Sequence, residues 1–259
     1  MRTCRTKHEL RAALGPLRGG SVGLVPTMGA LHDGHRSLLR AARRECDTVV
    51  MSLFVNPAQF DEGADLDRYP RDEGRDLGVA ADEGVDVVFV PTADEMYPAG
   101  FQTWVEVTEL GAILEGEHRP GHFRGVATVC LKLFNLVRPD VAYFGQKDAQ
   151  QLEVLRRMAL DLDLDLELRA LSTVRDADGL ALSSRNVLLG DDERRRAAVL
   201  PRALATGDAE EARRMLEEAG LDVDYVALAP FHPPVLAAAV RIGGTRLIDN
   251  ALVTGGDTT

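Results

Sequence analysis

The sequence predicts an α/β protein, in which helices cover both faces of a mostly parallel sheet and a smaller α+β unit follows. Two observations predict this class. Short apolar runs alternate with stretches of helical spacing, which is typical of parallel strands joined by right-handed crossovers. The run T-V-V-M-S-L-F-V at 48–55 is apolar on both of its alternating faces, as a buried parallel strand requires.

Each element has a local signal of its own. Apolar runs that stop at proline or at a glycine turn predict strands at 22–25, 48–55, 86–90 and 141–144, and a further strand is predicted at 164–171. Alternation of apolar and polar residues predicts a further strand at 101–107, at a sheet edge or in a subunit contact. Helical spacing predicts a helix from Gly34 onward and helices at 71–83, 125–137 and 149–160.

The C-terminal part of the chain has a different character. Helix formers and charged residues dominate 191–220, and short strands are predicted at 224–228 and 235–242. We therefore place a boundary near Thr173, between a sheet domain of residues 1–173 and a smaller domain of residues 174–259. Residues 255–259 are expected to fray.

Composition excludes several classes of protein. The 259 residues can bury a substantial core, and no apolar run approaches the roughly eighteen residues of a membrane span. A formal net charge of −11 argues against nucleic acid as the main partner. Three cysteines far apart form neither a disulfide framework nor a metal-binding pair. We expect a cytoplasmic protein with reduced, structural thiols.

The stretch 22–39 carries the strongest functional signal. A strand, a turn and a helix follow one another here, so unpaired helical amides lie at the carboxyl end of a strand and favour an anion such as phosphate. His32 and His35 are three residues apart, and on a first helical turn both rings could reach phosphoryl oxygens. The alternative is that each histidine is a capping or surface residue.

Several later stretches could also hold a ligand or could be ordinary turns. Asn56 and Gln59 follow the second strand. Their side-chain amides could bind a hydroxylated acid, or they could simply be residues of an ordinary turn. Lys147 at a second strand–turn–helix could neutralise phosphate or be an exposed lysine beside a capping aspartate. The polar stretch 117–124 reads as a loop with a supporting role.

Seven strings in order resemble the pantothenate synthetase (pantoate–beta-alanine ligase) family within the nucleotidyltransferase superfamily. They are P-T-M-G-A-L-H-D-G-H, S-L-F-V-N-P-A-Q-F, R-Y-P-R, R-P-G-H-F-R-G-V, F-G-Q-K-D-x-Q-Q, S-S-R-N and T-R-L-I-D-N. The resemblance implies a Rossmann-like sheet domain with a C-terminal α+β lid. It also implies ATP-dependent joining of pantoate to beta-alanine through a pantoyl-adenylate, with magnesium required and with a homodimer as the assembly.

The resemblance also implies roles for single residues. ATP would be bound by Met28, Gly29, Ala30, Leu31, His32, Asp33, Gly34, His35, Gly145, Gln146, Lys147, Asp148, Val174, Leu182, Ser183, Ser184 and Arg185. His35 would be the catalytic acid, assisted by His32 and Lys147. Gln59 would contact both pantoate and beta-alanine, Gln151 would hold pantoate, and Asn56 and Tyr69 would line the pocket. Magnesium would be held mainly through the ATP phosphates, and no protein ligand to it is assigned.

Two alternative functions stay open. One is an adenylyltransferase or cytidylyltransferase that stops after nucleotide transfer to a phosphorylated alcohol. The other is a non-catalytic nucleotide-binding protein in which both histidines and Lys147 are structural. The stretch 201–208 is also shorter than the family pattern, which bears on how a lid would close.

Overall fold

The computed structural model describes residues 1–60 and 63–253. Contacts between residues divide the chain into two compact units. Unit 1 contains Met1–Gly145 and Val154–Leu171, and unit 2 contains Gln146–Glu153 and Ser172–Thr259. Residues 146–153 therefore group with unit 2, whereas the predicted domains place them in the first; the division at 173 stays a prediction. The expected fraying of 255–259 lies outside the described residues.

A parallel sheet of six strands forms the centre of unit 1. The strands are β1 (Arg2–Cys4), β2 (Val22–Thr27), β3 (Thr48–Leu53), β4 (Val87–Phe89), β5 (Val141–Gly145) and β6 (Glu167–Leu171). Their order is β1-β4-β3-β2-β5-β6, with every pair parallel. The order reverses between β2 and β5, and in such sheets ligands bind outside the carboxyl ends of the strands at this point.

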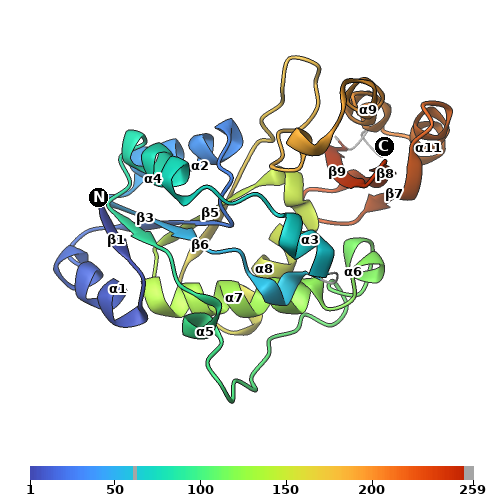
Figure 1. The fold of residues 1–259 in the computed structure, drawn as a ribbon. Coiled ribbons are helices and arrows are strands. Elements are labelled where there is room, and N and C mark those ends of the chain that lie inside the picture. The colour runs from blue at the N-terminus through green and yellow to red at the C-terminus, as the bar shows by residue number, and fades with distance from the viewer. Residues whose placement is uncertain (61–62, 254–259) are drawn as a thin grey trace. The chain divides into compact units, whose positions relative to one another are not determined.

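Helices cover both faces of this sheet. The helical elements up to β6 are α1 (Lys7–Leu14), α2 (Asp33–Glu45), α3 (Gly63–Arg68), α4 (Glu73–Asp82), α5 (Ala93–Met96), α6 (Glu115–His118), α7 (His122–Val137) and α8 (Ala149–Asp161), with 3-10 turns η1 (Gly15–Leu17), η2 (Pro57–Gln59) and η3 (Gln146–Asp148). In Figure 1, α2 and α4 lie on one face and α1 and α7 on the other.

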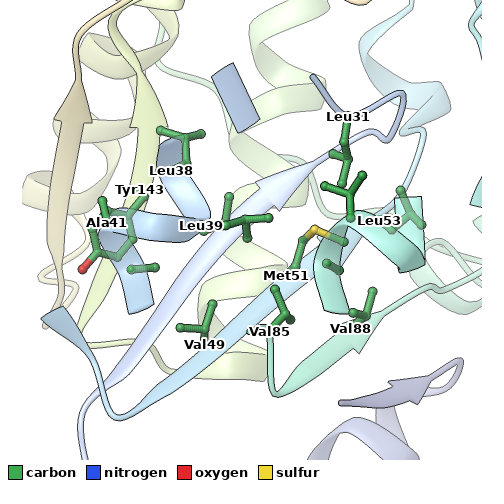
Figure 2. Close-up of a cluster of buried hydrophobic side chains, with 14 of the residues drawn as sticks. Leu31, Leu38, Leu39, Ala41, Val49, Met51, Leu53, Val85, Val88 and Tyr143 are labelled. Carbon is green, nitrogen blue, oxygen red and sulfur yellow. The ribbon is translucent and has the colours of Figure 1, made fainter. Parts of the chain in front are cut away.

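The core on the α2 face follows from strand alternation. Val49, Met51 and Leu53 of β3 point to this face because successive side chains of a strand alternate. They pack with Leu38 and Leu39 of α2, as Figure 2 shows. Each such side chain contributes about 1.5–3 kcal/mol through burial, so the start of α2 lies against a rigid support.

Unit 2 builds a second core on a small antiparallel sheet. It contains η4 (Asn186–Leu188), α9 (Asp191–Ala197), α10 (Val199–Leu204), α11 (Ala209–Glu218), β7 (Asp222–Ala229), β8 (Val235–Ile242) and β9 (Thr245–Leu252), and the strand order is β7-β8-β9. Leu200 and Leu216 from the helices pack with Leu236 and Val240 of β8. This is the α+β arrangement that the sequence predicts.

The predicted strand at 101–107 is wrong, because this segment forms neither helix nor strand. Its apolar side chains pack locally: Phe101 lies against Tyr97, with ring centroids 5.1 Å apart. The backbone N–H of Val105 donates to Thr128 Oγ1 of α7 at 3.0 Å instead of to a neighbouring strand. Alternation marked Phe101, Val105 and Val107, which are partly covered, but could not tell a packed loop from a paired strand.

Other boundaries also differ from prediction. Helix α7 begins at His122, three residues before the predicted start, and part of the expected loop forms α6. The elements β1, α1, α3, α5 and β9 were not predicted. Thr6 and Glu9 form a capping box at the start of α1, a signal that the sequence does contain. Within the described part of the chain, no helix is both long enough and apolar enough to cross a membrane.

Candidate active site

A buried carboxylate holds the turn that follows β2. Gly29 and Ala30 have φ values of 86° and 50°, so this turn is in the left-handed region at successive positions. Asp76 of α4 is 1% exposed and accepts hydrogen bonds from the N–H groups of Ala30 at 2.8 Å and Leu31 at 2.9 Å. A Cβ at position 29 would lie 2.7 Å from Asp76 Oδ2, so the carboxylate can lie this close only to glycine.

His32 and His35 cap the start of α2 reciprocally. The Nδ1 atom of His32 accepts from the N–H of Gly34 at 3.1 Å, and Nδ1 of His35 accepts from the N–H of His32 at 3.3 Å. The ring centroids are 4.1 Å apart. The capping role left open by the sequence is thus observed, and it occupies one nitrogen of each ring.

This capping determines what the two rings can do chemically. Because each Nδ1 accepts from a backbone N–H, the neutral ring carries its proton at Nε2 and can donate from there. A positively charged ring would need a proton at Nδ1 as well and would lose its cap. The geometry therefore favours two neutral Nε2–H donors side by side at the start of α2, an arrangement suited to phosphoryl oxygens.

The loop after β3 brings Asn56 and Gln59 together. Asn56 is 1% exposed, and its Nδ2 donates to Gln59 Oε1 at 3.0 Å. The backbone carbonyl of Gln59 accepts from Arg119 Nη2 at 3.2 Å and lies 2.8 Å from His122 Nδ1. Since a carbonyl oxygen can only accept, His122 carries a proton at Nδ1. Two residues of the predicted polar stretch thus hold the main chain of Gln59.

The other predicted residues of unit 1 lie near these groups or at the same edge of the sheet. Tyr69 is buried, with its ring edge-on to Phe60 at 5.8 Å between centroids. Gly145 ends β5, the strand that pairs with β2 at the reversal of strand order. A cavity of about 360 Å³ adjoins the turn, with Met28 and Asp76 in its lining beside apolar residues of the β3 and β4 ends.

In unit 2, the turn that carries Lys147 is bound to β9. Asn250 is 5% exposed, and its Nδ2 donates to the carbonyl oxygens of Gln146 and Lys147, each at 2.9 Å. The Lys147 ammonium lies 3.8 Å from Asp148 Oδ1, beyond normal hydrogen-bond length. Gln151 lies in the following α8 and is partly exposed. The backbone of this turn is therefore more firmly held than the ammonium group of the Lys147 side chain.

The predicted phosphate loop is bound to the same strand. Arg175 forms a two-pronged ion pair with Asp249, at 2.6 and 3.1 Å, and the Asp249 side chain is fully buried. The N–H of Leu182 donates to the carbonyl of Val174 at 3.0 Å, which closes the loop around the turn at Gly179. Ser183, Ser184 and Arg185 follow and are partly exposed. Adjacent residues of β9 therefore hold both predicted ATP-binding segments of unit 2.

Sequence reasoning missed four residues that hold the candidate segments of the two units. They are Asp76, Tyr97, Asp249 and Asn250. Asp249 and Asn250 lie in the string T-R-L-I-D-N, to which no role was assigned. A charged and an amide residue side by side in an apolar strand were a usable signal, because such groups are buried only with partners. Nothing local marks Asp76, which lies in a helix with other acidic residues.

Comparison with known proteins agrees with this architecture. The family model for pantoate-beta-alanine ligase matches residues 2–252. The pantothenate synthetase of Pelotomaculum thermopropionicum is 50% identical over 279 residues, covering 98% of this chain and 99% of the relative. That of Acidothermus cellulolyticus is 52% identical, covering 95% and 89%.

Solved structures agree as well. The crystal structure of pantothenate synthetase from Thermus thermophilus is 48% identical with a TM-score of 0.90, covering 97% of this chain and 99% of that one. Pantoate-beta-alanine ligase from Francisella tularensis, complexed with beta-gamma ATP and beta-alanine, is 35% identical with a TM-score of 0.90, and the match covers 97% of each chain. The predicted fold class and ligase activity are confirmed: the chain belongs to the pantoate-beta-alanine ligase family.

Proposed function

We propose that this chain condenses pantoate with beta-alanine in two steps. A pantoate carboxylate oxygen attacks the α-phosphorus of ATP, which releases pyrophosphate and forms pantoyl-adenylate. The neutral amine of beta-alanine then attacks the acyl carbon, which forms the amide of pantothenate and releases AMP. The observation that carries this proposal is the paired-histidine start of α2 at the reversal of strand order in a member of this family.

The α2 start would bind the nucleotide. Joining a carboxylate to a triphosphate brings anions together, so donors must face the positions where negative charge develops. Residues 28–35 supply the Nε2–H groups of His32 and His35, because most main-chain N–H groups of this stretch already donate within the protein. We assign His35 the catalytic role in which its neutral Nε2–H donates a hydrogen bond toward the reacting phosphate, and His32 a second such donor beside it.

The segments of unit 2 would supply positive charge and further donors. Residues 146–148, together with Gly145 of unit 1, would contact ATP, with the Lys147 ammonium neutralising phosphate charge. Val174 would lie on the adenine side, and residues 182–185 would donate to the phosphates from two hydroxyls and a guanidinium. Since an acyl-adenylate is labile to water, closure of these segments as a lid would protect it.

Amide groups would bind the acid and the amine. Gln59 would contact both pantoate and beta-alanine, and Gln151 would hold pantoate. Asn56 and Tyr69 would shape this pocket without taking part in the chemistry. The buried positions of Asn56 and Gln59 support selectivity, because a buried amide that loses its partner is costly.

Magnesium, a homodimer and a cytoplasmic location are parts of the same proposal and rest on the family resemblance. Among residues 1–60 and 63–253, no group of three or more histidine, cysteine or acidic side chains is placed to hold a metal ion. As the resemblance implies, magnesium would be held mainly through the phosphate oxygens of ATP, where it would neutralise charge.

An assay of the first step alone tests the proposal. Labelled pyrophosphate should exchange into ATP when pantoate and magnesium are present and beta-alanine is absent. Adding beta-alanine should then release AMP and form an amide. The order is required because an unactivated carboxylate does not condense with an amine in water.

The outcomes separate the alternatives. Exchange that requires beta-alanine would contradict the two-step mechanism. Exchange supported by a phosphorylated alcohol instead of pantoate would favour a simple nucleotidyltransferase. Folded protein that binds ATP without any exchange would favour the non-catalytic alternative.

A further inference from the structure

A hydrogen-bond chain, partly buried at Tyr97 and buried at Asn56, runs from an aromatic cluster to Gln59. The hydroxyl of Tyr97, which follows α5, donates to Asn56 Oδ1 at 2.8 Å. Asn56 Nδ2 donates to Gln59 Oε1 at 3.0 Å and to the carbonyl of Gly125 at 3.1 Å. The N–H of Ala58 also donates to Asn56 Oδ1, at 3.3 Å. These bonds use both protons of Nδ2 and both acceptor positions of Oδ1.

This chain determines which end of the Gln59 amide faces outward. The N–H of Ala58 can only donate and the carbonyl of Gly125 can only accept, so the Asn56 amide has a single compatible orientation. Its Nδ2 then faces Gln59 and needs an acceptor there, which must be Oε1. The opposite end of the Gln59 side chain is therefore Nε2, a donor suited to carboxylate and hydroxyl oxygens.

The backbone around this chain is held tightly enough to keep that orientation. A Cβ at position 125 would lie 2.2 Å from the carbonyl oxygen of Ala58, so α7 and η2 can approach this closely only at glycine. The main-chain oxygen of Gln59 is bound by Arg119 and His122. The freedom that remains is rotation of the two amides, and the Tyr97 hydroxyl opposes it.

Tyr97 is itself fixed in place. Its ring contacts Phe101 edge-on at 5.1 Å and stacks on Trp104 at 6.0 Å between centroids. The Lys132 ammonium lies 5.6 Å from the centre of the ring. Burial raises the pKa of Tyr97 above its ordinary value, so the hydroxyl keeps its proton and remains a donor.

We propose that Tyr97 is a positioning residue for substrate binding: through Asn56 it holds the Gln59 amide with Nε2 toward the oxygens of pantoate. Asn56 thus acts indirectly, because its own hydrogen-bonding positions are filled within the protein. This inference rests on the proposed function, in which Gln59 binds the substrate acid.

Tyr97→Phe tests the inference, because it keeps the ring and removes only the hydroxyl. We expect the KM for pantoate in the exchange assay to rise roughly three- to tenfold, the effect of one neutral hydrogen bond, while the KM for ATP stays at the wild-type value. Tyr143→Phe is the matched control. Tyr143 is another tyrosine of unit 1; it is buried, and its hydroxyl donates to Glu45 at 2.9 Å, so this variant should leave both KM values unchanged.

A double-mutant cycle with Gln59→Ala separates positioning from a general loss of structure. If Tyr97 acts through Gln59, adding Tyr97→Phe to Gln59→Ala should raise the KM for pantoate no further. Additive effects, or an unchanged pantoate KM in Tyr97→Phe, would overturn the inference while leaving the proposed function intact. Wild-type protein without pantoate-dependent exchange would overturn both.

Discussion

Replacing Asp76 with asparagine would test how the turn after β2, the proposed nucleotide-binding turn, is held. The carboxylate accepts one hydrogen bond on each oxygen, from Ala30 and Leu31. Asparagine keeps the size and one acceptor but presents Nδ2 where the second acceptor was. One backbone N–H of the turn would then face a donor inside the protein, and the turn would have to rearrange.

The expected loss of stability follows from the kind of hydrogen bond that is lost. A hydrogen bond to a charged group contributes about 1.5–3 kcal/mol, and removing a buried charge offsets part of that loss. We expect the free energy of unfolding to fall by roughly 1–3 kcal/mol, with a Tm decrease of about 2–4 °C per kcal/mol for a chain of this size. If the substitution destabilises the present conformation of the turn by about 1.4 kcal/mol relative to a rearranged one, the KM for ATP rises about tenfold.

Asp72→Asn is the matched control for this experiment. Asp72 is an exposed residue that caps the same helix by accepting from the N–H of Arg75 at 3.0 Å, and asparagine caps helices equally well. Thermal unfolding and the ATP dependence of pyrophosphate exchange should be measured for both variants. If Asp76→Asn matches Asp72→Asn in Tm and in KM, the carboxylate does not hold the turn and this reasoning is refuted.

Four further predictions concern the segments proposed to bind the nucleotide and the thiols. His35→Ala should fold and lose about a hundredfold or more in exchange rate; near-normal turnover with intact ATP affinity would remove its assigned role. Lys147→Arg should remain impaired because the guanidinium fork is larger than a point charge, and wild-type turnover of Lys147→Ala at saturating ATP would make the lysine a surface residue. Asn250→Ala releases two carbonyls of the turn at Gln146, so the KM for ATP should rise several-fold, and an unchanged value measured in the exchange assay would contradict this. The three cysteines should resist a thiol reagent until the protein unfolds, since all are buried and burial raises the pKa of Cys130 to about 12; rapid labelling of folded protein would disprove this.

The local pattern of the sequence determined the alternation of strands and helices, the H-x-G-H helix start and the candidate residues along both strand–turn–helix segments. These features are encoded within windows of about ten to twenty residues, because periodicity and turn chemistry act between near neighbours. The same pattern wrongly predicted a strand at 101–107, because the alternation there reflects packing on α7 and not pairing with a strand.

Only the tertiary structure decided what holds those candidate residues in place. Asp76 is 46 positions from Ala30, Tyr97 is 41 from Asn56, and Asn250 is 103 from Lys147. Each pair meets only after the sheets have assembled, and no local periodicity encodes a contact over such a distance. The histidine rings show the same division: the sequence placed them on one helical turn, whereas the reciprocal capping that leaves Nε2 as the donor depends on atomic positions in the folded turn.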